Sequence, residues 1–292
     1  MTLSSFLLSA SFLESLPHKS MEELRTYILT KGKEWFNSCP EEAVVIKKNL
    51  QRFGIPHDNA LVWEVQTHVL LHYYEKLLPL CLPSREFHRY LMERVAMPPE
   101  LEALKAGCGR GAGVVLAVCH FGAVECIGPA LAAHGLGLTG AFRFSTPQLS
   151  GAVRGRSAEL AASGLFAPMN FIEIGIGQPP AALEMAAVLR RGGLLLAVFD
   201  EKTNYSVPVS LFKKQVWGGA GLDRLVRFAQ AGAAVWSAFA KRNDDETYEV
   251  RLFEHSGGGP QLVQALYDNL EPLCAARCAQ WYFLHEEIPF VI

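Results

Sequence analysis

From residue 114 onward, short apolar runs alternate with helical segments, and this alternation constrains the fold more than any other feature of the sequence. The run Val114–Val118 is too short for a helix and contains no polar residue, which is typical of a strand buried on both faces. Strands separated by helical segments of about 10–15 residues are typical of βαβ units. The sequence therefore predicts an α/β fold with a central mixed β-sheet flanked by helices.

Further strands are expected where such runs recur, at Leu138–Phe142, Phe171–Ile174, Leu194–Phe199, Val207–Phe212, Ala234–Ala240 and Tyr248–Phe253. The last two of these strands are expected to pair with each other. Two charged pairs, Lys213–Lys214 and Lys241–Arg242, are expected to lie at solvated strand ends or in turns. A final helix is predicted from about Pro260 to Ala279.

The first 106 residues carry helical signals instead. Ser20 is a good N-cap for a helix that starts at Met21, and Asp58 to Leu80 is a long, largely apolar helical segment. We therefore divide the chain into an N-terminal helical region, residues 1–106, and an α/β core, residues 107–292, which together are expected to form one structural unit. The glycines between residues 107 and 113 precede a strand, so they indicate a connector rather than a dinucleotide-binding loop.

Composition argues against several classes of protein. Half of the residues are hydrophobic and 19% are charged, which argues against intrinsic disorder, and a net charge of −2 gives no general attraction to nucleic acid. Seven cysteines without paired spacing suit a reducing cytoplasm. No apolar stretch is long enough to span a membrane. The apolar start of the chain is interpreted as a packed helix, although a signal peptide or a helix seated on a membrane surface remains open.

Two histidines of the long N-terminal helix, His68 and His72, stand four residues apart, a spacing that can hold a metal ion. No acid lies between them in the pattern of known metal helices, and no third ligand is evident. Packing in the core or in a groove is therefore the favoured interpretation of this pair.

The main candidate for chemistry lies at the end of the first buried strand, where His120 is followed by Phe121 and Gly122. If the chain bends at Gly122, Glu125 in the first turn of the next helix can reach back to the imidazole. A carboxylate on one ring nitrogen fixes the tautomer and leaves the other nitrogen free to accept a proton, as in a general base. The positive end of that helix is expected to disfavour protonation of His120. The alternative is a buried histidine whose hydrogen bonds are satisfied by chance.

This arrangement, H-x-x-x-x-[DE] at a strand–helix junction, resembles the signature of the glycerolipid (lysophospholipid) acyltransferase superfamily. The sequence is most similar to the late acyltransferase family of lipid A biosynthesis, and the similarity covers roughly residues 45 to 285 in order. Besides the HFGxxE block, it includes Val45–Leu78, Phe142–Arg143, Arg154–Arg156, Leu189–Asp200, Val207–Phe212, and Pro272, Trp281 and His285. Two departures from the family pattern leave the acceptor less defined than the chemistry: no N-terminal membrane anchor is expected, and the segment Glu201–Tyr205 differs from the usual one.

The resemblance implies a role for each candidate residue. His120 would be the general base and Glu125 its partner. Arg143, Arg154 and Arg156 would hold an anionic group of the donor or acceptor, because a guanidinium suits phosphate. Asp200 would position the acceptor nucleophile or an arginine, and backbone donors near Gly122 would stabilise the tetrahedral oxyanion.

The implied function is transfer of a fatty acyl group from acyl carrier protein or coenzyme A to a hydroxyl or amine of a lipid or small-molecule acceptor. No metal or other cofactor is expected beyond the acyl thioester, and no nucleic-acid partner. The expected location is the cytoplasm, with contact at the inner face of the cell membrane left open. Two alternatives are a catalytically silent lipid- or carrier-binding protein of the same fold and an acyl-thioester hydrolase.

Overall fold

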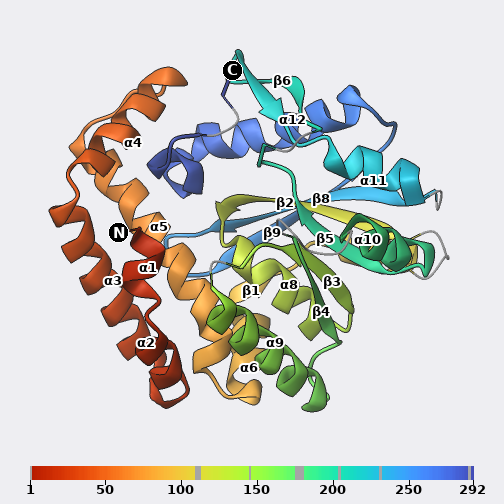
Figure 1. Ribbon diagram of the computed structural model, residues 1–292, viewed down its shortest axis with the longest axis horizontal. Coiled ribbons are helices and arrows are strands. Elements are labelled where there is room, and N and C mark those ends of the chain that lie inside the picture. Colours follow the sequence, from red (N-terminus) through yellow and green to blue (C-terminus); the bar gives the residue numbers. More distant parts are fainter. Residues whose placement is uncertain are drawn as a thin grey trace.

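The computed structural model describes residues 2–108, 113–144, 146–174, 181–202, 205–229, 232–288 and 291–292. Most of the connector predicted between residues 107 and 113 lies outside these residues. The described part is an α/β sandwich (Figure 1), as predicted: helices cover both faces of a central sheet, and N-terminal helices α1–α5 stand along one end of it.

The central sheet is mixed and has seven strands in the order β1-β9-β8-β2-β5-β3-β4. Strands β2, β3, β4, β5 and β8 run parallel, whereas β9 is antiparallel to β8, so the pairing predicted for these last two strands is confirmed. The bounds are β1 (Val95–Ala96), β2 (Val114–Gly122), β3 (Leu138–Phe142), β4 (Met169–Glu173), β5 (Leu194–Val198), β8 (Ala234–Arg242) and β9 (Tyr248–His255).

The two faces of the sheet are covered by different helices, because alternate residues of each strand point to opposite sides. In β2, Leu116 and Val118 pack into one core with helices α3, α5, α6 and α8, which we call the α8 face. Val115 and Ala117 pack into a second core with α10, α11 and α12, which we call the α12 face. All four side chains are fully buried, as expected for a strand covered on both sides.

The helices of the N-terminal region are α1 (Leu3–Leu7), α2 (Ala10–Ser15), α3 (Met21–Ser38), α4 (Glu41–Arg52), α5 (Asn59–Cys81), α6 (Ser84–Arg94) and α7 (Leu101–Cys108), with a short 3-10 turn η1 (Leu16–His18). The helices of the core are α8 (Val124–Ala133), α9 (Pro147–Ala162), α10 (Ala181–Arg190), α11 (Gly221–Ala229) and α12 (Pro260–Ala276). Two 3-10 turns follow, η2 (Cys278–Gln280) and η3 (Tyr282–His285).

The apolar start of the chain is packed, as the favoured interpretation predicted. Leu3, Leu7 and Phe12 are buried in the same core as the α8 face of the sheet. The expected N-cap is present too, because the Ser20 hydroxyl accepts the Glu23 amide and the Glu23 carboxylate accepts the Ser20 amide. Across the described ranges, no helix combines the length and the apolar character needed to cross a membrane.

The structure differs from the sequence predictions in three details. The N-terminal region is not wholly helical, because Val95–Ala96 forms β1 at the edge of the sheet, beside β9. The strand predicted at Val207–Phe212 exists as β6 (Val207–Leu211), but it pairs with β7 (Lys214–Gly218) in a separate hairpin over α12. The final helix ends at Ala276, and the chain continues in 3-10 turns that return to the sheet.

Candidate active site

The candidate site lies at the carboxyl ends of β2 and β5, which are neighbouring parallel strands. The chain leaves β2 into α8 on one face of the sheet and passes from β5 to α11 on the other face. Ligands of open α/β sheets bind in the crevice formed where adjacent strands connect to opposite faces. The register pairs Val118 with Val198, so His120 and Asp200, each two residues further along, meet at this point.

His120 and Asp200 form a close pair. The Asp200 carboxylate accepts the His120 backbone amide through Oδ2 and lies against the ring nitrogen Nδ1 through Oδ1, both at 2.9 Å. Because a carboxylate accepts hydrogen bonds, Nδ1 carries the proton of the neutral ring and Nε2 keeps its lone pair. Asp200 is fully buried, whereas the His120 side chain is 21% exposed, so a substrate can reach the imidazole but not the acid behind it.

The partner predicted for His120 was wrong. Glu125 does lie in the first turn of α8, but its carboxylate points to α5, where Oε1 is 3.3 Å from His72 Nε2 and 3.2 Å from Lys76 Nζ. Strand β2 extends through Gly122, so the chain turns into α8 too late for Glu125 to reach back to the His120 ring. Asp200, predicted to position an acceptor or an arginine, takes the place expected for Glu125.

The shift in the pKa of His120 is also opposite in direction to the prediction, in which the positive end of α8 disfavours protonation. Burial lowers it, but the charge of Asp200, the hydrogen bond to Asp200 and the charge of Glu201 together outweigh burial and the repulsion from Lys76, so the pKa is raised above 6.5. The imidazolium is therefore stabilised in the site, as a general base needs once it has taken a proton.

His72 behaves differently from His120. It is almost fully buried on α5, and its ring centre lies 6.3 Å from that of His120. Burial, with repulsion from Lys76 and His120, holds the pKa of His72 well below its usual range, so the ring is neutral. His68, one turn earlier, lies 3.4 Å from the Arg242 guanidinium, and burial with that charge lowers its pKa to about 3. In the part of the chain that the structure describes, no three His, Cys, Asp or Glu side chains are grouped to hold a metal ion.

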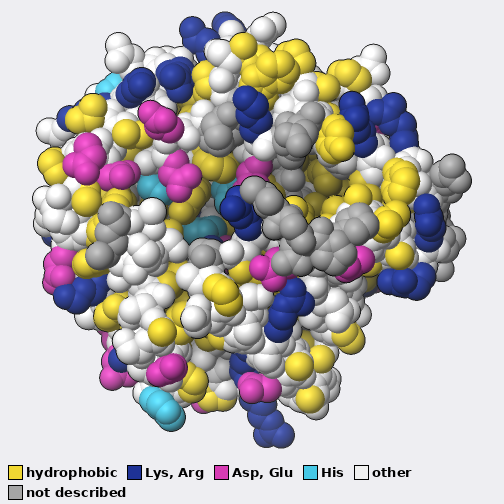
Figure 2. Space-filling model, viewed as in Figure 1, with side chains coloured by type: hydrophobic (Ala, Val, Ile, Leu, Met, Phe, Trp, Pro, Cys, Tyr) yellow, Lys and Arg dark blue, Asp and Glu magenta, His cyan; other side chains and the backbone are white. Residues whose placement is uncertain are grey.

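A second carboxylate, Glu201, borders the open side of the imidazole. Its Oε1 lies 3.8 Å from His120 Nε2, and its side chain is 58% exposed. Burial raises the pKa of Glu201 above its usual value, and the charge of Arg143, an exposed residue after β3, opposes this rise. Arg143, one of the three predicted arginines, therefore acts electrostatically on a residue of the site. Figure 2 shows histidine side chains in a hollow of this face, bordered by acidic side chains.

The other two predicted arginines are held by the protein itself. Arg156 donates to the carbonyls of Pro79 and Leu82, both at 2.6 Å, at the C-terminal end of α5, where a cation is favourable. Arg154 donates to the Phe171 carbonyl at 2.9 Å and lies 3.7 Å from the Glu173 carboxylate. The structure therefore shows both guanidinium groups hydrogen-bonded to backbone carbonyls of the protein.

A glycine is required at position 122 because β2 and β8 approach each other closely there. Its φ is +60°, and a Cβ at this position would lie 1.9 Å from the Ala240 carbonyl oxygen of β8. The next amide, of Ala123, already donates to that same carbonyl at 2.7 Å, so it is not free for an oxyanion. Gly122 thus fixes how the end of β2, with His120, lies on β8.

The C-terminal segment supplies an aromatic wall. The rings of Tyr282 and Phe283 lie 5.9 and 5.0 Å from the His120 ring, and the Tyr282 hydroxyl is 3.2 Å from that of Tyr73 on α5. His285 is buried and donates through Nδ1 to the Tyr282 carbonyl at 2.6 Å, which holds this 3-10 turn closed.

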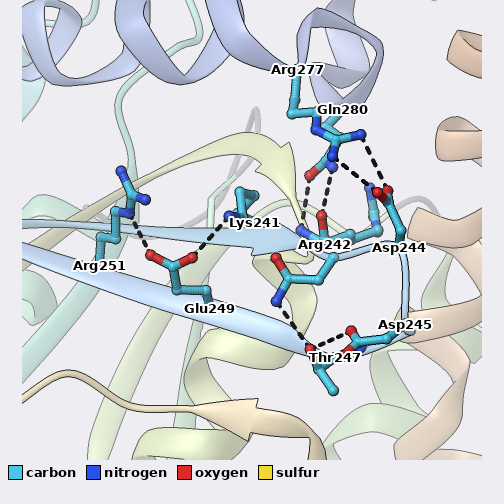
Figure 3. A network of polar contacts seen from close by, with 10 residues as sticks. Lys241, Arg242, Asp244, Asp245, Thr247, Glu249, Arg251, Arg277 and Gln280 are labelled. Carbon is cyan, nitrogen blue, oxygen red and sulfur yellow. Dashed lines mark hydrogen bonds and ion pairs between the residues drawn. The ribbon is translucent and has the colours of Figure 1, made fainter.

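The network in Figure 3 fastens this C-terminal segment to the sheet. Arg242, at the end of β8, donates its amide to Gln280 Oε1 at 2.9 Å and accepts from Gln280 Nε2 at 2.8 Å. Close by, the Arg277 guanidinium pairs with Asp244 at 3.1 Å. These contacts set the position of η3 and its aromatic residues beside His120.

The prediction that Lys241 and Arg242 are both solvated was wrong for Arg242. Its side chain is 6% exposed, and it forms a two-bond pair with Glu75 of α5, which is 1% exposed, at 2.6 and 2.7 Å. Lys241, in contrast, pairs with Glu249 near the surface. The side chains of Lys241 and Arg242 point to opposite faces of β8, so these adjacent residues differ in burial.

Comparison of the chain with known protein families found no family that matches it, and comparison with curated proteins found no match either. The site is therefore interpreted from its own geometry.

Sequence reasoning identified His120 but missed Asp200 as its partner, and it missed Lys76, Glu201 and Tyr282 as residues of the site. One signal was available: the runs ending Val118-Cys119-His120 and Val198-Phe199-Asp200 each place a polar residue at the same offset after a buried strand.

Proposed function

We propose that the protein is an acyltransferase that moves a fatty acyl group from a thioester, carried by acyl carrier protein or coenzyme A, to a hydroxyl or amine acceptor. The observation that carries the proposal is the His120–Asp200 pair, with Nδ1 bound to a buried carboxylate and Nε2 free on the solvent side. This is the arrangement of a general base that activates an incoming nucleophile.

The reaction needs no nucleophile from the protein. Cys119, next to His120 in the chain, is buried on the α12 face of the sheet, and burial with the nearby charge of Asp200 raises its pKa well above the usual range. In the proposed step, Nε2 takes the proton of the acceptor as its oxygen or nitrogen bonds to the thioester carbonyl carbon. The carbon–sulfur bond then breaks, and the leaving thiolate takes the proton back from the imidazolium.

The donor head group carries negative charge in both carriers, and Arg143 is an exposed cation whose charge acts on Glu201. The partly exposed ring of Tyr282 offers apolar surface beside the imidazole. Both features support an acyl thioester as substrate. A cytoplasmic location, with access to the membrane surface, belongs to the same proposal.

The test is intact mass spectrometry of donor and product, with palmitoyl-coenzyme A and palmitoyl acyl carrier protein each offered to a panel of alcohols and amines. His120→Ala should abolish transfer while the protein stays folded by circular dichroism. His18→Ala, at an exposed histidine in η1, is the matched control and should keep full activity. Free acid formed at the same rate with and without acceptor would identify a hydrolase. Undiminished transfer by His120→Ala would refute the assigned base.

A further inference from the structure

The position of Glu201 relative to His120 limits which nucleophile the site can use. The 3.8 Å between Glu201 Oε1 and His120 Nε2 is too long for a hydrogen bond between them. It is short enough for one donor atom to lie about 2.9 Å from both. The nucleophile of the proposed reaction must sit at Nε2, so it also lies against the Glu201 carboxylate.

We infer that the acceptor of this site is a primary amine rather than an alcohol, and that Glu201 is the residue that determines this preference. The inference rests on the proposed function and narrows it from hydroxyl or amine to amine alone. It depends on two proton acceptors, an imidazole nitrogen and a carboxylate oxygen, facing the same position.

Proton counting distinguishes the two acceptor classes. An alkylamine has a pKa near 10, as lysine does, so it arrives as an ammonium ion and must lose two protons to become an amide. The first proton passes to His120 Nε2, which frees the lone pair that bonds to the thioester carbonyl carbon. The second leaves the nitrogen of the tetrahedral intermediate to Glu201 and then to solvent. The carbon–sulfur bond breaks, and the thiolate takes the proton held by His120.

An alcohol has only one proton to give. When His120 Nε2 accepts it, the lone pairs of the alcohol oxygen face the Glu201 carboxylate, and neither group can donate to the other. An ammonium ion in the same position donates to both acceptors and carries the charge opposite to Glu201. The carboxylate therefore stabilises one acceptor and repels the other.

The surroundings suit Glu201 to this task. Burial raises its pKa, His120 lowers it and Asp200 raises it again, so the net effect is a carboxylate more basic than usual. The exposed part of the side chain lets the second proton reach water. Asp200 cannot perform this step, because it is fully buried behind the ring.

The experiment compares amine and alcohol acceptors of identical skeleton, dodecylamine with 1-dodecanol and hexylamine with 1-hexanol, each supplied with palmitoyl-coenzyme A or palmitoyl acyl carrier protein. Separate molecules are used because an ester of an amino alcohol rearranges to the amide. Wild-type protein, Glu201→Gln and the control Glu254→Gln, at an exposed acid on β9, are compared after subtraction of the reaction without protein.

We expect the wild type to acylate the amines faster than the alcohols. Glu201→Gln keeps the size of the side chain but cannot take a proton, so amine transfer should fall about tenfold or more while alcohol transfer stays equal or rises. Glu254→Gln should match the wild type. His120-dependent transfer with the same amine-to-alcohol ratio in wild type and Glu201→Gln would overturn this inference alone. No His120-dependent transfer to any acceptor would overturn the proposed function, and this inference with it.

Discussion

Replacement of Asp200 by asparagine tests which acid serves His120. The variant keeps the shape of a fully buried side chain but removes the charge that lies 2.9 Å from Nδ1. A hydrogen bond to a charged group contributes about 1.5–3 kcal/mol, which is about 10–150-fold in rate if lost only in the transition state. The asparagine amide also donates toward Nδ1, which moves the ring proton to Nε2 and blocks the base. The same change in serine proteases lowers kcat by about 10⁴.

We therefore expect Asp200→Asn to lower kcat for acyl transfer by about 10²–10⁴-fold, with little change in the melting temperature. The assay is steady-state thiol release with confirmation of product by mass spectrometry. The matched control is Glu125→Gln, because Glu125 contacts His72 and Lys76 instead of His120. It should keep more than about a tenth of the activity. The reasoning is refuted if Glu125→Gln loses as much activity as Asp200→Asn, or if Asp200→Asn is nearly fully active.

Three other outcomes are expected. The first concerns pH: kcat/KM should fall as the pH is lowered through the pKa of His120. This midpoint should lie above 6.5, because His120 must be unprotonated to act as a base and its pKa is raised. A midpoint below 6.5 in a pH–rate profile would contradict this. Gly122→Ala should lower both the melting temperature and kcat, because the new Cβ would clash with a carbonyl of β8. The control is Gly135→Ala. Gly135 also has a positive φ but lies in open space, so this change should lower only the melting temperature. Glu75→Gln leaves the buried guanidinium of Arg242 without a counter-charge. It should therefore reduce the free energy of unfolding, measured by urea denaturation, by about 3–5 kcal/mol. A loss below about 1 kcal/mol would show that the pair is solvated.

Much of the fold follows from local sequence pattern. Runs such as Val114–Val118 and Leu194–Phe199 are short and apolar, as is typical of buried strands, and the helices between them indicated the α/β class. The short strand Val95–Ala96 could not be predicted, because two residues carry no periodicity and its partner lies about 150 residues away. Burial of Arg242 was missed because its counter-charge, Glu75, belongs to a distant helix.

The candidate site was predictable only in part, for the same reason. His120 stands out because it ends an apolar run, but its partner was sought five residues away, where the motif places an acid. The actual partner is 80 residues away and is brought near by the pairing of β2 with β5, which local pattern does not specify. The arginines show the same limit: Arg156 was expected to bind an anion, and helix α5 takes its hydrogen bonds instead.

The most direct test of the account is a nitrogen-15 NMR titration of His120 in the wild type, Asp200→Asn and Glu125→Gln. We predict a neutral ring protonated on Nδ1, a pKa above 6.5 in the wild type, a lower pKa in Asp200→Asn and almost no change in Glu125→Gln. A ring protonated on Nε2, or a pKa that responds to Glu125 and not to Asp200, would contradict the assignment of the His120–Asp200 pair.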